Sequence, residues 1–258
     1  KRQWAIFLPT NEWMQPVVFG LQNGSPLLKD GGRYGAFEEP AFRGAFEFYV
    51  KLFRDGLAPV AGNNDIANPY QEFARGTFAM WITGPWNIGE FERRLPPEMQ
   101  HAWATAPLPG PTGAPSGVSN AGGSSLVVFK GSPHPKEAWE LIEFLSRADI
   151  QRRFYHLTGD LPAQIDAWQD SSLSGDRYLT AFYTQLQRVR PTPKVPEWEF
   201  LTSKIIDISE LSIRGGLSTD RALAQLDAQV NRILEKRRWI LARASHAPHD
   251  SAATVKLK

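Results

Sequence analysis

The glycine- and proline-rich stretch at residues 110–123 constrains this fold more than any other feature. Its sequence, GPTGAPSGVSNAGG, lacks the apolar periodicity of a packed helix or strand. Apolar patterns resume directly after it, in SLVVF at residues 125–129. We interpret the stretch as a flexible crossing point between two lobes.

The part before this crossing alternates strands with helices. Pro40 favours a helix start, because proline suits the first helical position, and apolar residues then recur at spacings of three and four up to Phe53. Asn68 predicts an N-cap with Pro69 behind it. The expected elements are a strand at 3–8, a loop or hairpin at 23–36, helices at 40–56 and 68–76, a strand at 77–82, a short helix after Trp86, and a strand at 101–108.

The part after the crossing is richer in helices. The apolar run at 125–129 predicts a strand covered on both faces of a sheet. Helices are expected at 132–147, at 151–157 with a break at Gly159, from 166 to about 189, at 199–214 and at 218–238, the last capped by Ser218 or Thr219. The proline-rich segment 191–196 favours extended chain. The chain is therefore a helix-rich α/β protein with few strands.

Composition excludes several functions. The chain has no cysteine, which rules out disulfides, thiolate metal sites and cysteine nucleophiles. A net charge of +2 gives no general attraction to nucleic acid. No segment matches a P-loop, a G-x-S-x-G elbow or an H-E-x-x-H motif, so no cofactor or metal is predicted. Nine tryptophans suit a ligand with flat apolar faces.

Six short segments, in order, resemble the extracellular solute-binding proteins of ABC importers, the family that includes maltose-, trehalose- and glycerol-3-phosphate-binding proteins. The segments are Phe73-Ala74-Arg75-Gly76-Thr77-Phe78-Ala79-Met80, Gly84-Pro85-Trp86, Ala106-Pro107-Leu108-Pro109, Gly122-Gly123-Ser124-Ser125-Leu126, Ala138-Trp139-Glu140-Leu141-Ile142-Glu143-Phe144-Leu145 and Gly159-Asp160-Leu161-Pro162-Ala163. The resemblance covers residues 1 to about 236.

The resemblance implies a periplasmic-binding-protein-like fold, with two α/β lobes, hinge crossings and ligand held in the cleft between them. Residues 1–117 would form the first part of the second lobe, 118–166 a returning segment of the first lobe, and 167–238 the helical part of the second lobe. Residues 239–258 would form a basic and polar tail. The family has a further N-terminal portion before the point matching Lys1, which we expect to be missing from the first lobe here.

The function implied is capture, without catalysis, of a sugar such as maltose or trehalose. The partners would be the sugar and a permease in the inner membrane, and the protein would be a periplasmic or membrane-tethered extracellular monomer. Sugar rings pack on aromatic planes while their hydroxyls need fixed polar partners. The resemblance assigns the stacking role to Trp86, directly after a strand, although a core role is the alternative.

Further ligand contacts are expected at four places in the sequence. Trp198 follows a proline-stiffened segment, and Trp13 lies beside Asn11 and Glu12 where relatives place aromatic and polar contacts; for both, simple packing is the alternative. The remaining candidates are Gly122, Gly123, Ser124 and Asn120, where glycines let backbone approach a ligand closely or merely allow a hinge. Trp4, Trp81, Trp139 and Trp168 are expected in the core, where truncating Trp139 would cost ~3–5 kcal/mol.

Two alternatives remain open from the sequence. The first alternative is a glycosidase, because Glu197 and Glu199 flank Trp198. The two glutamates would share one face of an extended chain, so catalysis would need a further carboxylate from elsewhere. A phosphorylated ligand such as glycerol-3-phosphate is the other, with Arg190 or Lys194 as the cation.

Overall fold

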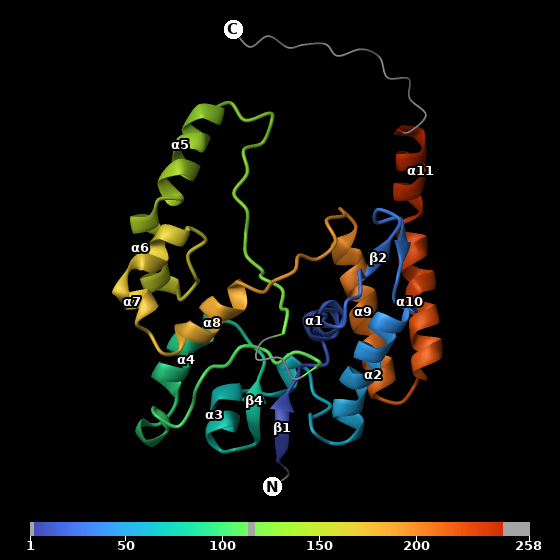
Figure 1. The fold of residues 1–258 in the computed structure, drawn as a ribbon, viewed down its shortest axis with the longest axis horizontal. Helices are drawn as coiled ribbons and strands as arrows, with labels where there is room; N and C mark the ends of the chain where they lie inside the picture. Colours follow the sequence, from blue (N-terminus) through green and yellow to red (C-terminus); the bar gives the residue numbers. More distant parts are fainter. Residues whose placement is uncertain (1–2, 113–116, 245–258) are drawn as a thin grey trace.

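The computed structural model describes residues 3–112 and 117–244, and Figure 1 shows their arrangement. Before the crossing the elements are β1 (Trp4–Phe7), α1 (Met14–Gln22), β2 (Leu28–Lys29), β3 (Tyr34–Gly35), α2 (Pro40–Arg54), α3 (Pro69–Ala74), β4 (Phe78–Trp81) and α4 (Asn87–Arg94). After it come α5 (Pro135–Leu145), α6 (Ala148–Thr158), α7 (Ser171–Ser174), α8 (Leu179–Leu186), α9 (Trp198–Ile213), α10 (Thr219–Ile233) and α11 (Glu235–Ala244). Short 3₁₀ helices lie at Asn63–Asp65, Pro97–Met99 and Ile165–Gln169. The helix-rich α/β prediction is confirmed.

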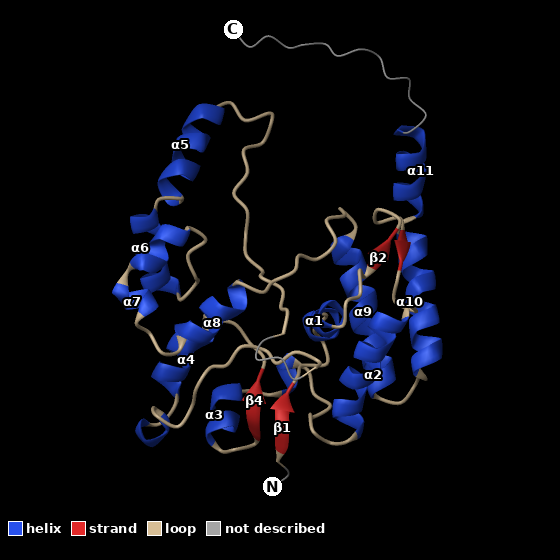
Figure 2. Cartoon of the chain, in the orientation of Figure 1, coloured by secondary structure: helices blue, strands red, loops and turns tan. Residues whose placement is uncertain are grey.

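The described strands form two small sheets. β1 and β4 pair in parallel, with Trp4 opposite Phe78, and the rings of Phe7 and Phe78 stack with centroids 5.2 Å apart. β2 and β3 form the antiparallel hairpin expected within residues 23–36. Helices therefore dominate the architecture, as Figure 2 shows.

The main core joins segments that are far apart in the sequence. The apolar stripe of α2, including Phe42 and Phe46, is fully buried against α1, α9 and α10. Leu201 and Ile205 of α9 and Leu223 of α10 lie in the same core, each with 0% of its surface exposed. The helical periodicity of these segments thus follows from burying one stripe of each helix.

A second core lies beside α4. It combines Ile88 and Phe91 of α4 with Trp103, Trp168 and Tyr178. The rings of Trp103 and Tyr178 stack in parallel, with centroids 3.8 Å apart. Trp168 is thus a core residue, as predicted, and Trp103 lies in the same core.

The predicted helix boundaries follow from capping chemistry. The Asn68 side chain accepts a hydrogen bond from the amide of Gln71, and the Ser218 hydroxyl accepts one from the amide of Arg221. Gly56 and Gly159 follow helix ends with φ of 72° and 77°, a backbone conformation that favours glycine. The helix predicted from residue 166 is instead divided, because α7 ends at Ser174, with Gly175 as its C-cap, and α8 begins at Leu179.

Two predicted strands are absent from the described structure, so both predictions were wrong. Residues 101–108 and 125–129 are irregular, and no described strand pairs with either of them. Side chains in the second segment are exposed, with Leu126 at 56% and Phe129 at 79%. A buried strand needs hydrogen-bonded neighbours, which the described residues do not supply at this place.

The core placement of Trp139 was also wrong. Its side chain on α5 is 56% exposed, and its indole N–H donates to Glu143 Oε1 at 2.8 Å. Large apolar side chains of α5, α6 and the preceding residues 126–129 are exposed in the same way, and we call this set the α5–α6 apolar face. Its large exposed members are Leu126, Val127, Phe129, Trp139, Leu141, Phe144, Leu145, Phe154 and Leu157.

The predicted crossing runs beside residues 188–190. Ser119 forms a parallel bridge with Val189, and Asn120 Nδ2 donates to the carbonyl oxygen of Arg190 at 3.0 Å. Gln22 Nε2 of α1 donates to the carbonyl of Val118, which ties this joint to the main core. Residues 113–116 of the predicted crossing, and residues 245–258 of the predicted tail, lie outside the described residues.

Candidate functional site

Trp13 and Trp198 meet where α1 and α9 begin. Their ring centroids are 5.6 Å apart and their planes are nearly perpendicular, at 89°. Trp198 is only 8% exposed and belongs to the main core, whereas Trp13 is half-buried. A ligand at this place would therefore reach Trp13 more readily, with Trp198 behind it as a rigid support.

The polar candidates beside Trp13 already bind another part of the chain. Asn11 Oδ1 accepts from the backbone amide of Asn63 at 2.9 Å, and Glu12 Oε1 accepts from Asn63 Nδ2 at 2.6 Å. Glu12 Oε2 accepts from Gln15 Nε2 at 2.6 Å. These bonds hold the 62–65 loop against the start of α1. Because a carboxylate can accept about four hydrogen bonds, Glu12 still has lone pairs for a ligand hydroxyl.

A buried hydroxyl lies below this region. Burial raises the pKa of Tyr49 well above its usual range, and the carboxylates of Glu12 and Glu210 add to the rise. Tyr49 therefore stays protonated at neutral pH. Its side chain is fully buried in the main core, so it contributes to packing and does not contact solvent.

Trp86 presents an open aromatic surface. It directly precedes α4 and follows β4, and its side chain is 54% exposed. The indole folds back over Gly84 so closely that a Cβ there would lie 2.1 Å from a ring carbon. The Cα of Trp86 also lies beside Gly159, at the end of α6. Among the described residues, Trp86 makes no ring contact with the Trp13–Trp198 pair.

The candidates on the crossing divide into two kinds. Asn120 uses its amide to bind the carbonyl oxygen of Arg190, as described above. Gly122, Gly123 and Ser124 are exposed, and no heavy atom lies within 4 Å of where a Cβ would sit on either glycine. Gly123 has a φ of 133°, which L side chains rarely adopt. The space beside both Cα atoms is therefore open, and ligand contact at these residues stays a prediction.

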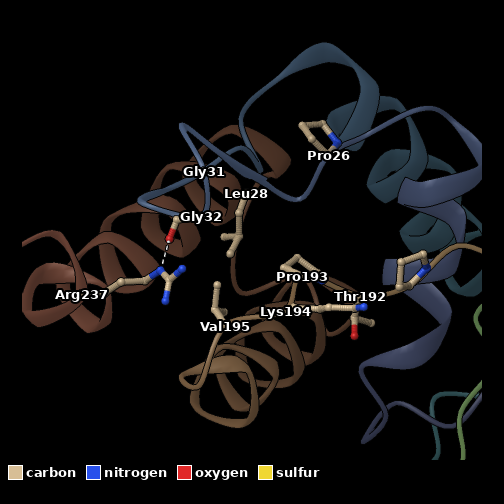
Figure 3. Close-up of a pocket in the computed structure, with 10 residues that line it drawn as sticks. Pro26, Leu28, Gly31, Gly32, Thr192, Pro193, Lys194, Val195 and Arg237 are labelled. Carbon is tan, nitrogen blue, oxygen red and sulfur yellow. Dashed lines mark hydrogen bonds between the residues drawn. The ribbon is translucent and has the colours of Figure 1, made fainter. Parts of the chain in front are cut away.

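A hollow of about 270 Å³ lies beneath the β2–β3 hairpin (Figure 3). Gly31 and Gly32 of the hairpin, Lys194 of the proline-rich segment and Arg237 of α11 line it, together with Pro26, Leu28, Pro191, Thr192, Pro193 and Val195. It has no aromatic lining and includes none of the ligand-contact residues predicted from the sequence. It is therefore separate from the candidate sugar contacts.

The carboxylates considered for catalysis do not face each other. Glu197 and Glu199 lie at the start of α9 and not in extended chain, and residues two apart on a helix point in different directions. The described residues contain no group of three or more histidine, aspartate or glutamate side chains placed to hold a metal ion. None of the described helices is both long enough and apolar enough to span a bilayer.

Comparison with known proteins identifies the family. The profile of the bacterial extracellular solute-binding proteins matches residues 3–152. The chain belongs to this family. The solved structure of the sugar-binding protein MalE from Xanthomonas citri is 44% identical and has a TM-score of 0.88, over 93% of this chain and 60% of that chain. This similarity confirms the predicted periplasmic-binding-protein-like fold.

Curated relatives agree with this assignment. The maltodextrin-binding protein MdxE of Bacillus subtilis is 26% identical over 196 residues, which is 74% of this chain and 44% of the relative. A protein of Brucella abortus that is named as a binding protein is 26% identical over 216 residues, which is 83% of this chain and 51% of the relative. The chain spans about half the length of the curated relatives it matches.

Sequence reasoning missed Asn63, which binds both Asn11 and Glu12. It lies in a loop about fifty residues away, in the segment GNND, where polar residues are common for solubility alone. The Trp13–Trp198 contact was also missed, because the two residues are far apart in the sequence and no motif near either one indicates the other.

Proposed function

We propose that this protein is the substrate-binding component of an ABC importer and captures a di- or oligosaccharide such as maltose or trehalose. The observation that carries the proposal is the likeness to the sugar-binding MalE of Xanthomonas citri, at 44% identity over nearly the whole chain. A maltodextrin-binding relative supports the same class of ligand.

The proposed ligand contacts combine stacking with hydrogen bonds. The exposed indole of Trp86 offers an apolar plane for a sugar ring, and Trp13, backed by Trp198, offers a second. Glu12, Asn11 and Asn120 would supply side-chain groups for hydroxyls, and Gly122, Gly123 and Ser124 would supply backbone amides and a hydroxyl. These groups come from both sides of the crossing, as a cleft between lobes requires.

We further propose the lobe boundaries predicted from the sequence. Residues 118–166 would form the returning segment of the first lobe, and residues 1–117 and 167–238 would form the second lobe. The α5–α6 apolar face supports this division, because large apolar side chains gathered in one part of a chain are ordinarily covered by other apolar groups. Its cover would be the part of the relatives that this chain does not span.

Capture would occur without chemistry on the ligand, in the periplasm or at the outer cell surface. Closure of the two lobes on a sugar would then be recognised by a membrane permease, with the binding protein itself a monomer. Incubation with maltose followed by chromatography tests the absence of catalysis, since a binding protein returns the sugar unchanged.

Isothermal titration of the protein with maltose, trehalose and glycerol-3-phosphate tests the proposed function. We expect a sugar to bind and Trp86→Ala to weaken that binding at least tenfold, since an aromatic plane contributes about 1.5–3 kcal/mol when a ligand covers it. Trp139→Ala is a matched control, because Trp139 is 56% exposed and Trp86 is 54% exposed. Equal affinity in the parent and Trp86→Ala would show the stacking assignment to be wrong.

Binding of glycerol-3-phosphate alone would instead direct attention to cations. Arg190 Nη1 donates to the carbonyl of Leu21 at 3.3 Å, while Lys194 lines the hollow of Figure 3. Loss of that binding in Lys194→Ala would favour a phosphorylated ligand over a sugar.

A further inference from the structure

One side of α11 is fixed to the body of the protein by two arginines. Arg237 Nε donates to the carbonyl oxygen of Gly32 at 3.0 Å (Figure 3), and Arg238 Nη1 donates to that of Arg33 at 3.1 Å. Both acceptors belong to the turn between β2 and β3. These two bonds determine which side of α11 faces the protein and which side faces solvent.

The solvent side of α11 combines aromatic, aliphatic and cationic groups. Trp239 is 58% exposed and Ile240 is 47% exposed. Lys236 lies one turn before Ile240, and Arg243 lies one turn after Trp239, so all four share this side. The Arg243 guanidinium stacks over the Trp239 ring, 4.5 Å from its centroid.

The end of α10 extends the same surface. Arg232 lines a shallow hollow together with Lys236 and Trp239. We call this surface the basic α11 face; it comprises Arg232, Lys236, Trp239, Ile240 and Arg243. Glu235 also lines the hollow, so the face and the hollow together hold three cations and one carboxylate. Within the described part of the chain, none of these three cations forms an ion pair.

We propose that the basic α11 face docks onto an anionic phospholipid surface. Its cations complement the negative headgroups, which attract Lys and Arg side chains within a Debye length. Its tryptophan is the side chain that favours the boundary between headgroups and acyl chains.

The position of α11 favours a flat partner. In Figure 1 the helix continues from α10 beyond the β2–β3 hairpin, so it lies at the edge of the described structure. A single helix at an edge presents a convex surface along its length, and a layer of headgroups can contact all of that surface at once. An acidic polypeptide is the competing partner, and the experiment distinguishes the two.

Co-flotation of the 258-residue protein with lipid vesicles tests the proposal. Vesicles of phosphatidylcholine alone are compared with vesicles of equal parts phosphatidylcholine and phosphatidylglycerol, at low and high salt. We expect binding only to the anionic vesicles, with a strong decrease at high salt. The double variant Lys236→Glu/Arg243→Glu should bind at least about 25-fold more weakly, since each cation strengthens such binding about fivefold.

The matched control is Arg54→Glu/Arg221→Glu, which changes the net charge equally. Both arginines are exposed on helices of the main core, away from α11. Circular dichroism establishes that each variant is folded. Binding retained by the control and lost by the α11 variant supports the proposal. Equal losses in both variants, or equal binding to neutral and anionic vesicles, would overturn it.

A third variant separates the aromatic group from the charges. Trp239→Ala should weaken binding to the anionic vesicles several-fold and make the remainder more sensitive to salt. Capture by immobilised polyglutamate without any vesicle binding would overturn the proposal in favour of an acidic polypeptide. None of these assays includes a sugar, so their failure would leave the proposed sugar capture unaffected.

Discussion

Asp227 of α10 offers a sharp test of how the main core is held together. It is a charged residue with only 7% of its surface exposed, and it binds a segment distant in the sequence. Its Oδ1 accepts from the amide of Phe37 at 3.1 Å, and its Oδ2 accepts from the amide of Glu38 at 3.0 Å. The carboxylate therefore fixes the chain after β3 against α10. Gly35 allows this approach, because a Cβ there would lie 2.1 Å from Oδ1.

The expected loss in the free energy of unfolding follows from these two hydrogen bonds. A hydrogen bond to a charged group contributes about 1.5–3 kcal/mol, and a buried N–H left without a partner keeps its desolvation cost. Asp227→Ala loses both bonds, so we expect a loss of about 3–5 kcal/mol in the free energy of unfolding. Asp227→Asn keeps one acceptor oxygen but turns an amide N–H₂ toward the other backbone donor, so about half of that loss is expected.

Thermal unfolding by circular dichroism measures both variants. At ~2–4 °C per kcal/mol for a chain of this size, Asp227→Ala should lower Tm by about 6–20 °C. Asp220→Ala is the control on the same helix, since its side chain is 82% exposed and its ion pair with Arg43 should contribute less than about 1 kcal/mol. A Tm for Asp227→Ala within the range of that control would refute the assigned role.

Three further predictions concern single residues. Ser218→Ala should lower the free energy of unfolding by about 1 kcal/mol, because α10 loses its N-cap. Urea denaturation measures this change, and an unchanged denaturation midpoint would contradict the capping role. Trp139→Ala should change Tm by no more than about 3 °C, because the indole is mostly exposed and bonds only Glu143; a larger fall would place Trp139 in a core. Gly84→Ala should displace the Trp86 indole and weaken sugar binding several-fold with little change in Tm. Full affinity in titration would show that sugar binding does not depend on the position of this ring.

The sequence predicted best where structure depends on neighbouring residues in the chain. Pro40, Asn68 and Ser218 each start a helix by local chemistry, and the structure confirms each start. The apolar stripe of α2 likewise indicated its buried side, because a helix of this length has one consistent inner face.

Prediction failed where burial depends on distant parts of the chain. The run at 125–129 has the composition of a buried strand, but a strand forms only beside hydrogen-bonded neighbours. Trp139 and Trp86 are almost equally exposed, although one was predicted in the core and the other at a ligand site. The residues next to a tryptophan in the sequence do not indicate whether a distant segment will cover its side chain.

The same contrast between local and distant interactions applies to the candidate site. Trp86 could be located because Gly84 and Pro85 define a turn directly after a strand. The contact between Trp13 and Trp198 depends instead on packing α1 against α9, which no local pattern encodes. The use of Asn11 and Glu12 to hold Asn63 is likewise a property of the folded chain.

The joint between residues 118–120 and 188–190 can be followed by hydrogen exchange. The amide of Ser119 donates to the carbonyl of Arg188 at 3.0 Å, and the amide of Arg190 donates to the carbonyl of Ser119 at 2.8 Å. Both amide protons lie in irregular chain, where exchange with solvent is otherwise fast. Their protection therefore reports whether the two segments remain joined, and any twist that separates them would release both protons together.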